Sequence, residues 1–223
     1  MPFHDRTEAG RRLAAALGRF RTEPCVVLAL PRGGVPVAAE VASALNAPMD
    51  LVLVRKIGVP MQPELAMGAV VDGEHPLVVR NRDIIGLAGV READFQAVCT
   101  REREEIARRR ALYLGDRAAP PVEGRVAIVV DDGVATGATT RAALRAVRLR
   151  KPARLVLAVP VAPTRTLVEL RDEADEVVCL EDYEDFGAIG LFYADFRQVG
   201  DHEVTAILAR FPAVAPQDRA PAS

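Results

Sequence analysis

The chain has 223 residues, of which half are hydrophobic and only 4% aromatic, so one α/β domain with ample core is the simplest expectation. Its 29 Lys and Arg residues against 31 Asp and Glu give a formal net charge of −2, which argues against a general nucleic-acid or membrane-surface binder. Cys25, Cys99 and Cys179 lack metal-ligand spacing and predict small core residues in a reduced compartment. Without a signal segment or a membrane-length apolar run, we expect a cytoplasmic protein.

The first quarter of the chain predicts a β-loop-α-β unit with two parallel strands, preceded by an amphipathic helix. Two prolines and a glycine then predict a loop. These elements are a helix over Glu8–Phe20, a strand over Cys25–Leu30, a turn over Pro31–Gly34, a helix over Val35–Leu45, a strand over Met49–Arg55 and a loop over Lys56–Ala66.

The remaining chain alternates strands and helices, and we expect residues 1–212 to form one domain with a disordered tail at 213–223. The long charged helix is interpreted as a solvated face, with a subunit contact in a homodimer as the alternative. The elements are strands over Met67–Val71 and Leu77–Val79 around a turn at Asp72-Gly73, a helix over Glu92–Tyr113, strands over Val126–Val130, Arg154–Val161 and Glu176–Leu180, and helices over Ala138–Leu149, Pro163–Asp172 and Glu203–Phe211.

The most informative segment begins at the apolar strand Val126–Val130, which is followed by two acids, a turn of small residues and a helix. Such a turn exposes backbone N–H groups, and the first turn of the helix adds unpaired donors at the positive end of its dipole. Hydroxyls of Thr136, Thr139 and Thr140 add further donors. Paired acids beside a phosphate cradle suit a ligand with a phosphate and vicinal hydroxyls, which describes a phosphorylated ribose. An acidic turn before a helix cap is the alternative.

This segment resembles the phosphoribosyl pyrophosphate (PRPP) signature of the type I phosphoribosyltransferases. The resemblance implies a mainly parallel central sheet flanked by helices, with a flexible loop and a small hood at about residues 181–200. It implies that the acids hold the ribose hydroxyls, that the turn wraps the 5′-phosphate, and that Mg²⁺ is held mainly by PRPP and water near the acids. The matching residues are Asp131, Asp132, Gly133, Val134, Ala135, Thr136, Gly137, Ala138 and Thr139.

The turn after the first strand is a candidate pyrophosphate site. Gly33 and Gly34 let backbone amides approach oxyanions, and Arg32 offers a bidentate guanidinium at the carboxyl end of a strand. The resemblance matches this turn to the family's pyrophosphate loop, which often contains an unusual cis peptide. A plain strand-to-helix turn is the alternative.

A second cationic segment follows the second strand. Arg55 and Lys56, followed by the predicted loop, resemble the catalytic loop of adenine-type phosphoribosyltransferases, which folds over PRPP and excludes water. Cations there would stabilise the charge of the departing pyrophosphate. We also expect Glu64 in this loop to be a candidate proton acceptor. Two surface cations without a catalytic role are the alternative.

The acceptor site is the least defined part of the prediction. Ala135 stands where hypoxanthine-guanine enzymes usually place an acidic base, and no Lys follows Lys151, so the chain departs from that branch. Clustered aromatics near a glycine offer a stacking surface for a flat base, with core packing as the alternative. Glu181 and Asp195 are further candidate proton acceptors. The predicted hood residues are Tyr183, Phe186, Phe192 and Tyr193.

Together these features predict a Mg²⁺-dependent phosphoribosyltransferase that displaces pyrophosphate from PRPP with a purine- or pyrimidine-like nitrogen acceptor. The alternative is a non-catalytic PRPP-binding regulatory module, because the same fold also serves as a regulator. Such a sensor should keep Asp131 and Asp132 while losing the catalytic cations, whereas this chain retains Arg55 and Lys56. We expect small molecules as partners, with no nucleic acid and no membrane.

Overall fold

The structure, a computed structural model, describes residues 2–72 and 76–211. Its centre is a five-stranded sheet in the order β2-β1-β6-β7-β8, in which every neighbouring pair is parallel. The predicted α/β architecture is therefore confirmed, and the tail predicted at 213–223 lies outside the described residues. The strands are β1 (Cys25–Ala29), β2 (Met49–Leu51), β6 (Val126–Val130), β7 (Arg154–Pro163) and β8 (Glu176–Tyr183).

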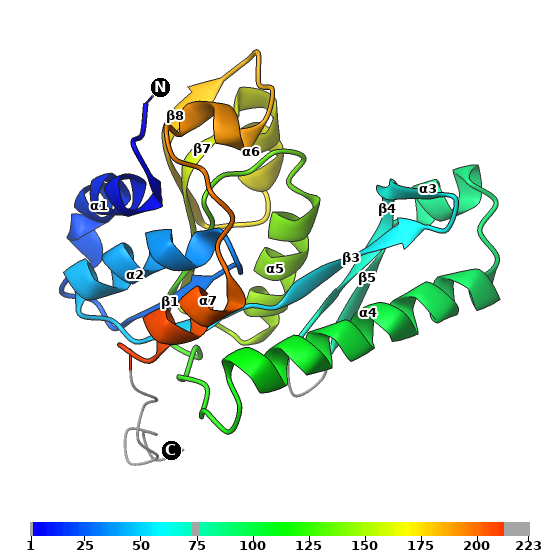
Figure 1. Cartoon of the computed structure of the whole chain (residues 1–223), viewed down its shortest axis with the longest axis horizontal. Helices are drawn as coiled ribbons and strands as arrows, with labels where there is room; N and C mark the ends of the chain where they lie inside the picture. Colours follow the sequence, from blue (N-terminus) through cyan, green and yellow to red (C-terminus); the bar gives the residue numbers. More distant parts are fainter. Residues whose placement is uncertain (1, 73–75, 212–223) are drawn as a thin grey trace.

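Helices cover both faces of this sheet, as a buried parallel sheet requires (Figure 1). Alternate residues of β1 divide between the two cores: Val27 faces the α1 and α2 side, whereas Leu28 faces the α5 and α6 side. No helix within the described residues is long and apolar enough to cross a membrane. The helices are α1 (Arg6–Ala16), α2 (Gly34–Leu45), α5 (Ala138–Leu149), α6 (Thr164–Leu170) and α7 (Asp201–Leu208), with 3-10 turns at Gly18–Phe20 and Ile189–Phe192.

A second unit, the arm, projects from the central sheet (Figure 1). It consists of an antiparallel sheet, β3 (Val54–Val59), β4 (Gln62–Val71) and β5 (Leu77–Arg80), with helices α3 (Arg82–Leu87) and α4 (Glu92–Tyr113). The predicted bounds of α4 are confirmed. One side of α4 buries Phe95, Val98 and Ile106 against the arm, while most of its charged residues other than Glu102 lie toward solvent.

The predicted loop over Lys56–Ala66 was wrong, because this segment forms the β3-β4 hairpin, whose turn is at Pro60 and Met61. The register shifts on either side of Gly58, where an added Cβ would lie 2.4 Å from the carbonyl oxygen of Pro63. Glycine therefore permits the close approach of the two chains at this bulge. Pro63 is tolerated because β5 pairs only with Gly68–Val71, which leaves this part of β4 without a second neighbour. The single strand predicted over Met49–Arg55 is likewise divided between β2 and β3.

Candidate active site

The two acids of the sequence signature lie at the carboxyl end of β6, the central strand of the main sheet. The backbone N–H of Asp132 donates to Oδ1 of Asp131 over 2.9 Å. Burial raises the pKa of the Asp131 carboxyl well above its usual range, and the neighbouring charge of Asp132 adds to this effect. A carboxylate in such surroundings is stabilised by hydrogen-bond donors, and ligand hydroxyls would supply them.

The turn after the acids is shaped to receive a phosphate. Gly137 adopts a left-handed conformation (φ 74°) directly before α5, and no described side chain caps that helix. The first-turn N–H groups of α5 therefore remain available to a ligand. Thr166 of α6 supports the turn from behind by donating its hydroxyl to the carbonyl oxygen of Ala135 over 2.9 Å. Thr136 and Thr139 are exposed, whereas Thr140 is buried and cannot offer the hydroxyl that the sequence predicted.

The predicted pyrophosphate turn lies directly beside the acids. Its peptide bond between Pro31 and Arg32 is cis, as the resemblance implied. A Cβ added to Gly33 would lie 2.1 Å from Oδ2 of Asp132, and one added to Gly34 would lie 2.7 Å from the carbonyl oxygen of Val130. Only glycine permits this approach, so the two turns that sequence analysis identified separately form one site.

Arg32 is linked to the arm through α7. Its guanidinium lies 3.6 Å from Oδ1 of Asp201, and the hydroxyl of Tyr113 at the end of α4 donates to the same oxygen. The bond from Tyr113 lowers the pKa of Asp201, while burial, followed by this bond, raises the pKa of Tyr113 to about 12. Because Arg32 is only about one-third exposed, its guanidinium is held near one position at the edge of the turn.

The side chains of the two predicted catalytic cations do not lie together, because consecutive residues of β3 point to opposite faces. Arg55 donates to Glu102 of α4 over 2.8 Å. Lys56 contacts Glu64 across the hairpin, with Nζ 3.0 Å from Oε2, and the side chain of Glu64 is 98% exposed. The alternation of side chains along β3 thus places Arg55 against the buried carboxylate of Glu102, whereas Lys56 contacts the exposed side chain of Glu64.

The predicted hood lies over the acids. Ile189 from its 3-10 turn contacts Gly133, where an added Cβ would lie 2.7 Å from Cγ2 of that side chain. Phe192 stacks between Tyr183 and Phe186, with ring centroids 4.7 and 4.8 Å apart, and all three side chains are partly buried.

Tyr193 differs from the other hood aromatics because its side chain is 3% exposed and its hydroxyl donates to the carbonyl oxygen of Asp132 over 2.6 Å. No face of this ring is open to a base, so the stacking role predicted for Tyr193 gives way to that of a brace. Of the other candidate proton acceptors, Glu181 binds Arg12 and Asp195 accepts the backbone N–H of Arg197.

Sequence reasoning missed Arg6, which is buried in the first turn of α1 and donates Nε to Oδ2 of Asp132 over 2.7 Å. Its guanidinium also donates to the carbonyl oxygen of Arg197 and lies 3.9 Å from the ring centroid of Phe196. No local pattern indicates this contact, since 126 residues separate the two partners.

Comparison with known proteins agrees with this geometry. Residues 4–197 match the family described as "Phosphoribosyl transferase domain". The chain belongs to this family. A crystal structure of TT1426 from Thermus thermophilus is 42% identical and superposes with a TM-score of 0.82, covering 96% of this chain and 100% of that chain.

Two Mycobacterium tuberculosis proteins are also similar, and one is named "Putative phosphoribosyl transferase Rv0571c". It and MT0597 are each 45% identical over 208 residues, which is 93% of this chain and 46% of theirs. The phosphoribosyl transferase chain described here therefore spans about half the length of these relatives.

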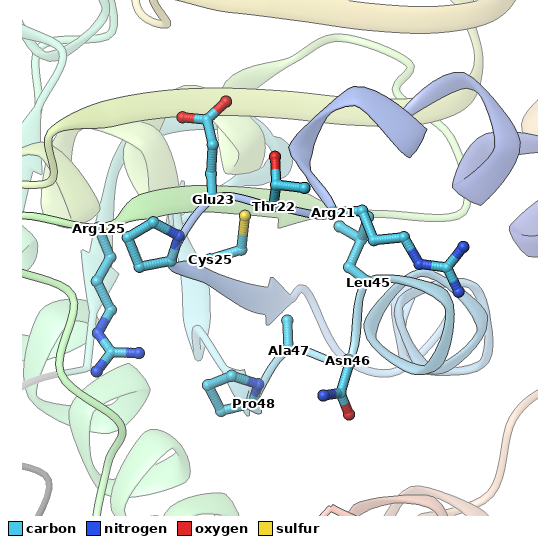
Figure 2. Close-up of a pocket in the computed structure, with 10 residues that line it drawn as sticks. Arg21, Thr22, Glu23, Cys25, Leu45, Asn46, Ala47, Pro48 and Arg125 are labelled. Atoms are coloured by element: carbon cyan, nitrogen blue, oxygen red, sulfur yellow. The ribbon is translucent and has the colours of Figure 1, made fainter.

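A pocket at the amino ends of the central strands, near the start of β1, does not belong to this site, which lies at their carboxyl ends (Figure 2). It is lined in part by Arg21, Cys25, Asn46 and Arg125. Burial raises the pKa of the Cys25 thiol to about 11, and its S–H donates to the carbonyl oxygen of Phe20, which is unlike a reactive cysteine. The chemistry of the phosphoribosyl transferase domain is expected at the carboxyl ends, where the signature acids lie.

Proposed function

We propose that the chain transfers the 5-phosphoribosyl group from PRPP to a purine- or pyrimidine-like nitrogen acceptor and releases pyrophosphate. The observation that carries this proposal is the contact between the two turns, in which Gly33 lies against the carboxylate of Asp132. This contact brings a candidate pyrophosphate loop, an acid pair and an uncapped helix N-terminus to one edge of the sheet. PRPP presents the matching groups, because its ribose hydroxyls lie between a 5′-phosphate and a 1′-pyrophosphate.

Each part of the site has a defined task in this proposal. The 5′-phosphate would receive N–H groups from the turn Ala135–Thr139 and from the first turn of α5, where the helix dipole favours an anion. The acid pair would accept hydrogen bonds from the ribose hydroxyls. Arg32 and the backbone of Gly33 and Gly34 would bind the pyrophosphate. Lys56 would stabilise charge that develops on this leaving group.

Magnesium fits this arrangement as a companion of the substrate. Among the described residues, no group of three or more His, Cys, Asp or Glu side chains could hold a metal ion by itself. Mg²⁺ retains water readily and is often bound through substrate phosphates with one or two carboxylates nearby. We therefore expect it to be held mainly by PRPP and water near Asp131 and Asp132, where it would neutralise the pyrophosphate.

The stacked rings of Tyr183, Phe186 and Phe192 support an aromatic acceptor, because partly exposed aromatic faces bind flat heterocycles. They pack in the same cluster as Ile189, which contacts Gly133, and so we place them on the ribose side of the site. A base bound there would attack C1′ of the ribose as pyrophosphate departs. We expect small molecules of this reaction, in the cytoplasm, to be the partners of the chain.

The test combines PRPP binding by calorimetry, with and without Mg²⁺, and a pyrophosphate-release screen over a panel of purine and pyrimidine bases. Replacing both Asp131 and Asp132 with Asn should abolish PRPP binding while the circular dichroism spectrum remains that of a folded chain. Unchanged PRPP affinity in this double variant would overturn the assignment. Binding without release for any base would instead support a PRPP-sensing module.

A further inference from the structure

The two signature acids have unequal surroundings. Asp132 is enclosed, with a side chain only 10% exposed: Arg6 donates to one of its oxygens, and the backbone of Gly33 lies against the same carboxylate. Asp131 is only partly buried, and its Oδ1 accepts a bond only from the backbone of the next residue among the described contacts. A ribose could therefore reach Asp131 without displacing any side chain, whereas one carboxylate oxygen of Asp132, Oδ2, is already bound to Arg6.

Three separate elements meet at Asp132. Arg6 arrives from α1, Gly33 from the pyrophosphate turn, and Tyr193 from the hood, where its hydroxyl donates to the carbonyl oxygen of Asp132. Arg6 ties α1 to the hood as well, because it also donates to the carbonyl oxygen of Arg197 over 2.8 Å and stacks on Phe196. Arg6 joins these contacts. It is a buried cation paired with the carboxylate of Asp132, and removing either partner of such a buried pair is costly.

We propose that Arg6 is a positioning residue that holds Asp132 as the anchor of the site, leaving Asp131 as the carboxylate that binds the ribose hydroxyls. This inference rests on the proposed use of PRPP and assigns different tasks to the two acids. Arg6 offsets part of the charge of Asp132 and so weakens the repulsion between the two carboxylates. It also fixes the distance between the pyrophosphate turn and the hood, which enclose the ligand from two sides.

The experiment compares PRPP affinity in four variants by calorimetry. Asp131→Asn should lose at least about tenfold, because it replaces the charged acceptor of the ribose hydroxyls with a neutral amide. Arg6→Gln should lose a similar amount, because it leaves Asp132 buried without its cation. The double variant Arg6→Gln with Asp132→Asn should recover part of the PRPP affinity that Arg6→Gln loses, because a neutral amide pair replaces the ion pair. Arg11→Gln is the matched control, since Arg11 lies on the same helix with a side chain 71% exposed.

PRPP affinity would not recover in the double variant if Asp132 itself bound the ribose hydroxyls. If the double variant bound PRPP as weakly as Asp131→Asn, Asp132 would contact the ribose directly and the inference would be wrong. If the unmodified chain failed to bind PRPP, the proposed function would fall and the inference with it. If the unmodified chain binds PRPP but the variants do not behave as predicted, only the inference fails, so the two failures are distinguishable.

A second measurement follows the unmodified chain and uses a variant only to assign one signal. In protein labelled with ¹⁵N at arginine Nε, the Arg6 resonance should be protected from exchange in the empty chain and remain so when PRPP binds. The assignment of this resonance comes from Arg6→Lys. Disappearance or rapid exchange of the signal on addition of PRPP would show that the ion pair opens to release Asp132, which would overturn the inference.

Discussion

Arg55 of β3 donates its Nε–H to Oε2 of Glu102 on α4 over 2.8 Å, and this bond joins the base of the arm to its long helix. The Arg55 side chain is 35% exposed and that of Glu102 is 10% exposed, so the carboxylate is the partner that cannot be rehydrated easily. Arg55 thus faces α4, together with Ile57, whose side chain is fully buried in the core cluster that contains Phe95. This arrangement indicates a structural role for Arg55.

We predict that Arg55→Ala lowers the free energy of unfolding by about 1–3 kcal/mol, because it leaves the buried Glu102 carboxylate with the longer contact to Arg101, at 3.4 Å, in place of the 2.8 Å bond. PRPP affinity should change by less than about threefold, since this side chain is turned toward α4. Urea unfolding and calorimetry check the two effects. A large loss of PRPP affinity with unchanged stability would return Arg55 to the catalytic role that the sequence predicted.

Lys56 should show the opposite behaviour. Its exposed partner Glu64 holds it weakly, and it lies on the face of β3 opposite to Arg55. We predict that Lys56→Ala lowers the rate of pyrophosphate release by about 10²–10³ while PRPP affinity falls far less, because a cation near the leaving group meets more charge in the transition state.

The control for this prediction is Lys56→Arg, which retains the charge at the same position and should restore part of the rate. The measurement requires an acceptor from the base screen, followed by separate determination of turnover and PRPP affinity. Equal losses in both quantities would make Lys56 a binding residue. No loss in either would identify a surface charge.

Sequence reasoning succeeded where the signal is local. The run from Val126 through Thr139 combines a buried strand, an acid pair and a small-residue turn within one short segment, and each part has a conformational cause in its own residues. The bounds of α4 were also predicted, because no glycine or proline interrupts the segment from Glu92 to Tyr113.

It failed where long-range packing overrides local preference. Gly58, Pro60 and Pro63 favour a loop by composition, yet cross-strand pairing and a bulge accommodate them in a hairpin. Because the segment that begins at Lys56 is a strand and not a loop, the side chains of Arg55 and Lys56 point to opposite faces and do not lie together as expected. The contact between Arg6 and Asp132 had no local signal at all.

Gly33 provides a test of the contact between the two turns. An added Cβ would lie 2.1 Å from Oδ2 and 2.5 Å from Cγ of Asp132, so Gly33→Ala must displace either the acid or the turn. We predict that PRPP affinity falls at least about tenfold, as measured by calorimetry, because the two halves of the site no longer fit the same ligand.

Gly86→Ala is the matched control for this substitution. Gly86 lies within α3, has no atom within 4 Å of an added Cβ, and should be unchanged in PRPP affinity. Alanine in a helix should even stabilise the chain by about 0.5–1 kcal/mol. Equal affinities in the Gly33 and Gly86 variants would show that the distance between the turns is not needed for binding.

The carboxyl of Asp131 should lower the stability of the empty chain in a way that depends on pH. Burial and the charge of Asp132 raise its pKa in the folded state above the value in the unfolded state. A carboxyl with a raised folded-state pKa favours folding when protonated, and this contribution is lost as the pH rises through the folded-state pKa. At neutral pH, above the unfolded-state pKa of about 4, this group therefore lowers stability, whereas below that pKa it does not.

We predict that Asp131→Asn unfolds at a higher temperature than the unmodified chain at pH 7, although it loses PRPP binding. Asparagine can still accept the N–H of Asp132 through its side-chain oxygen, so the local hydrogen bond is retained. The stability difference should shrink as the pH falls toward 4, and thermal unfolding measured across this range checks both its sign and its direction. Asp116→Asn, at an exposed position, should show no such dependence. A variant that is less stable than the unmodified chain at pH 7 would mean that the Asp131 carboxylate is stabilised in the empty site, contrary to the effect of its burial.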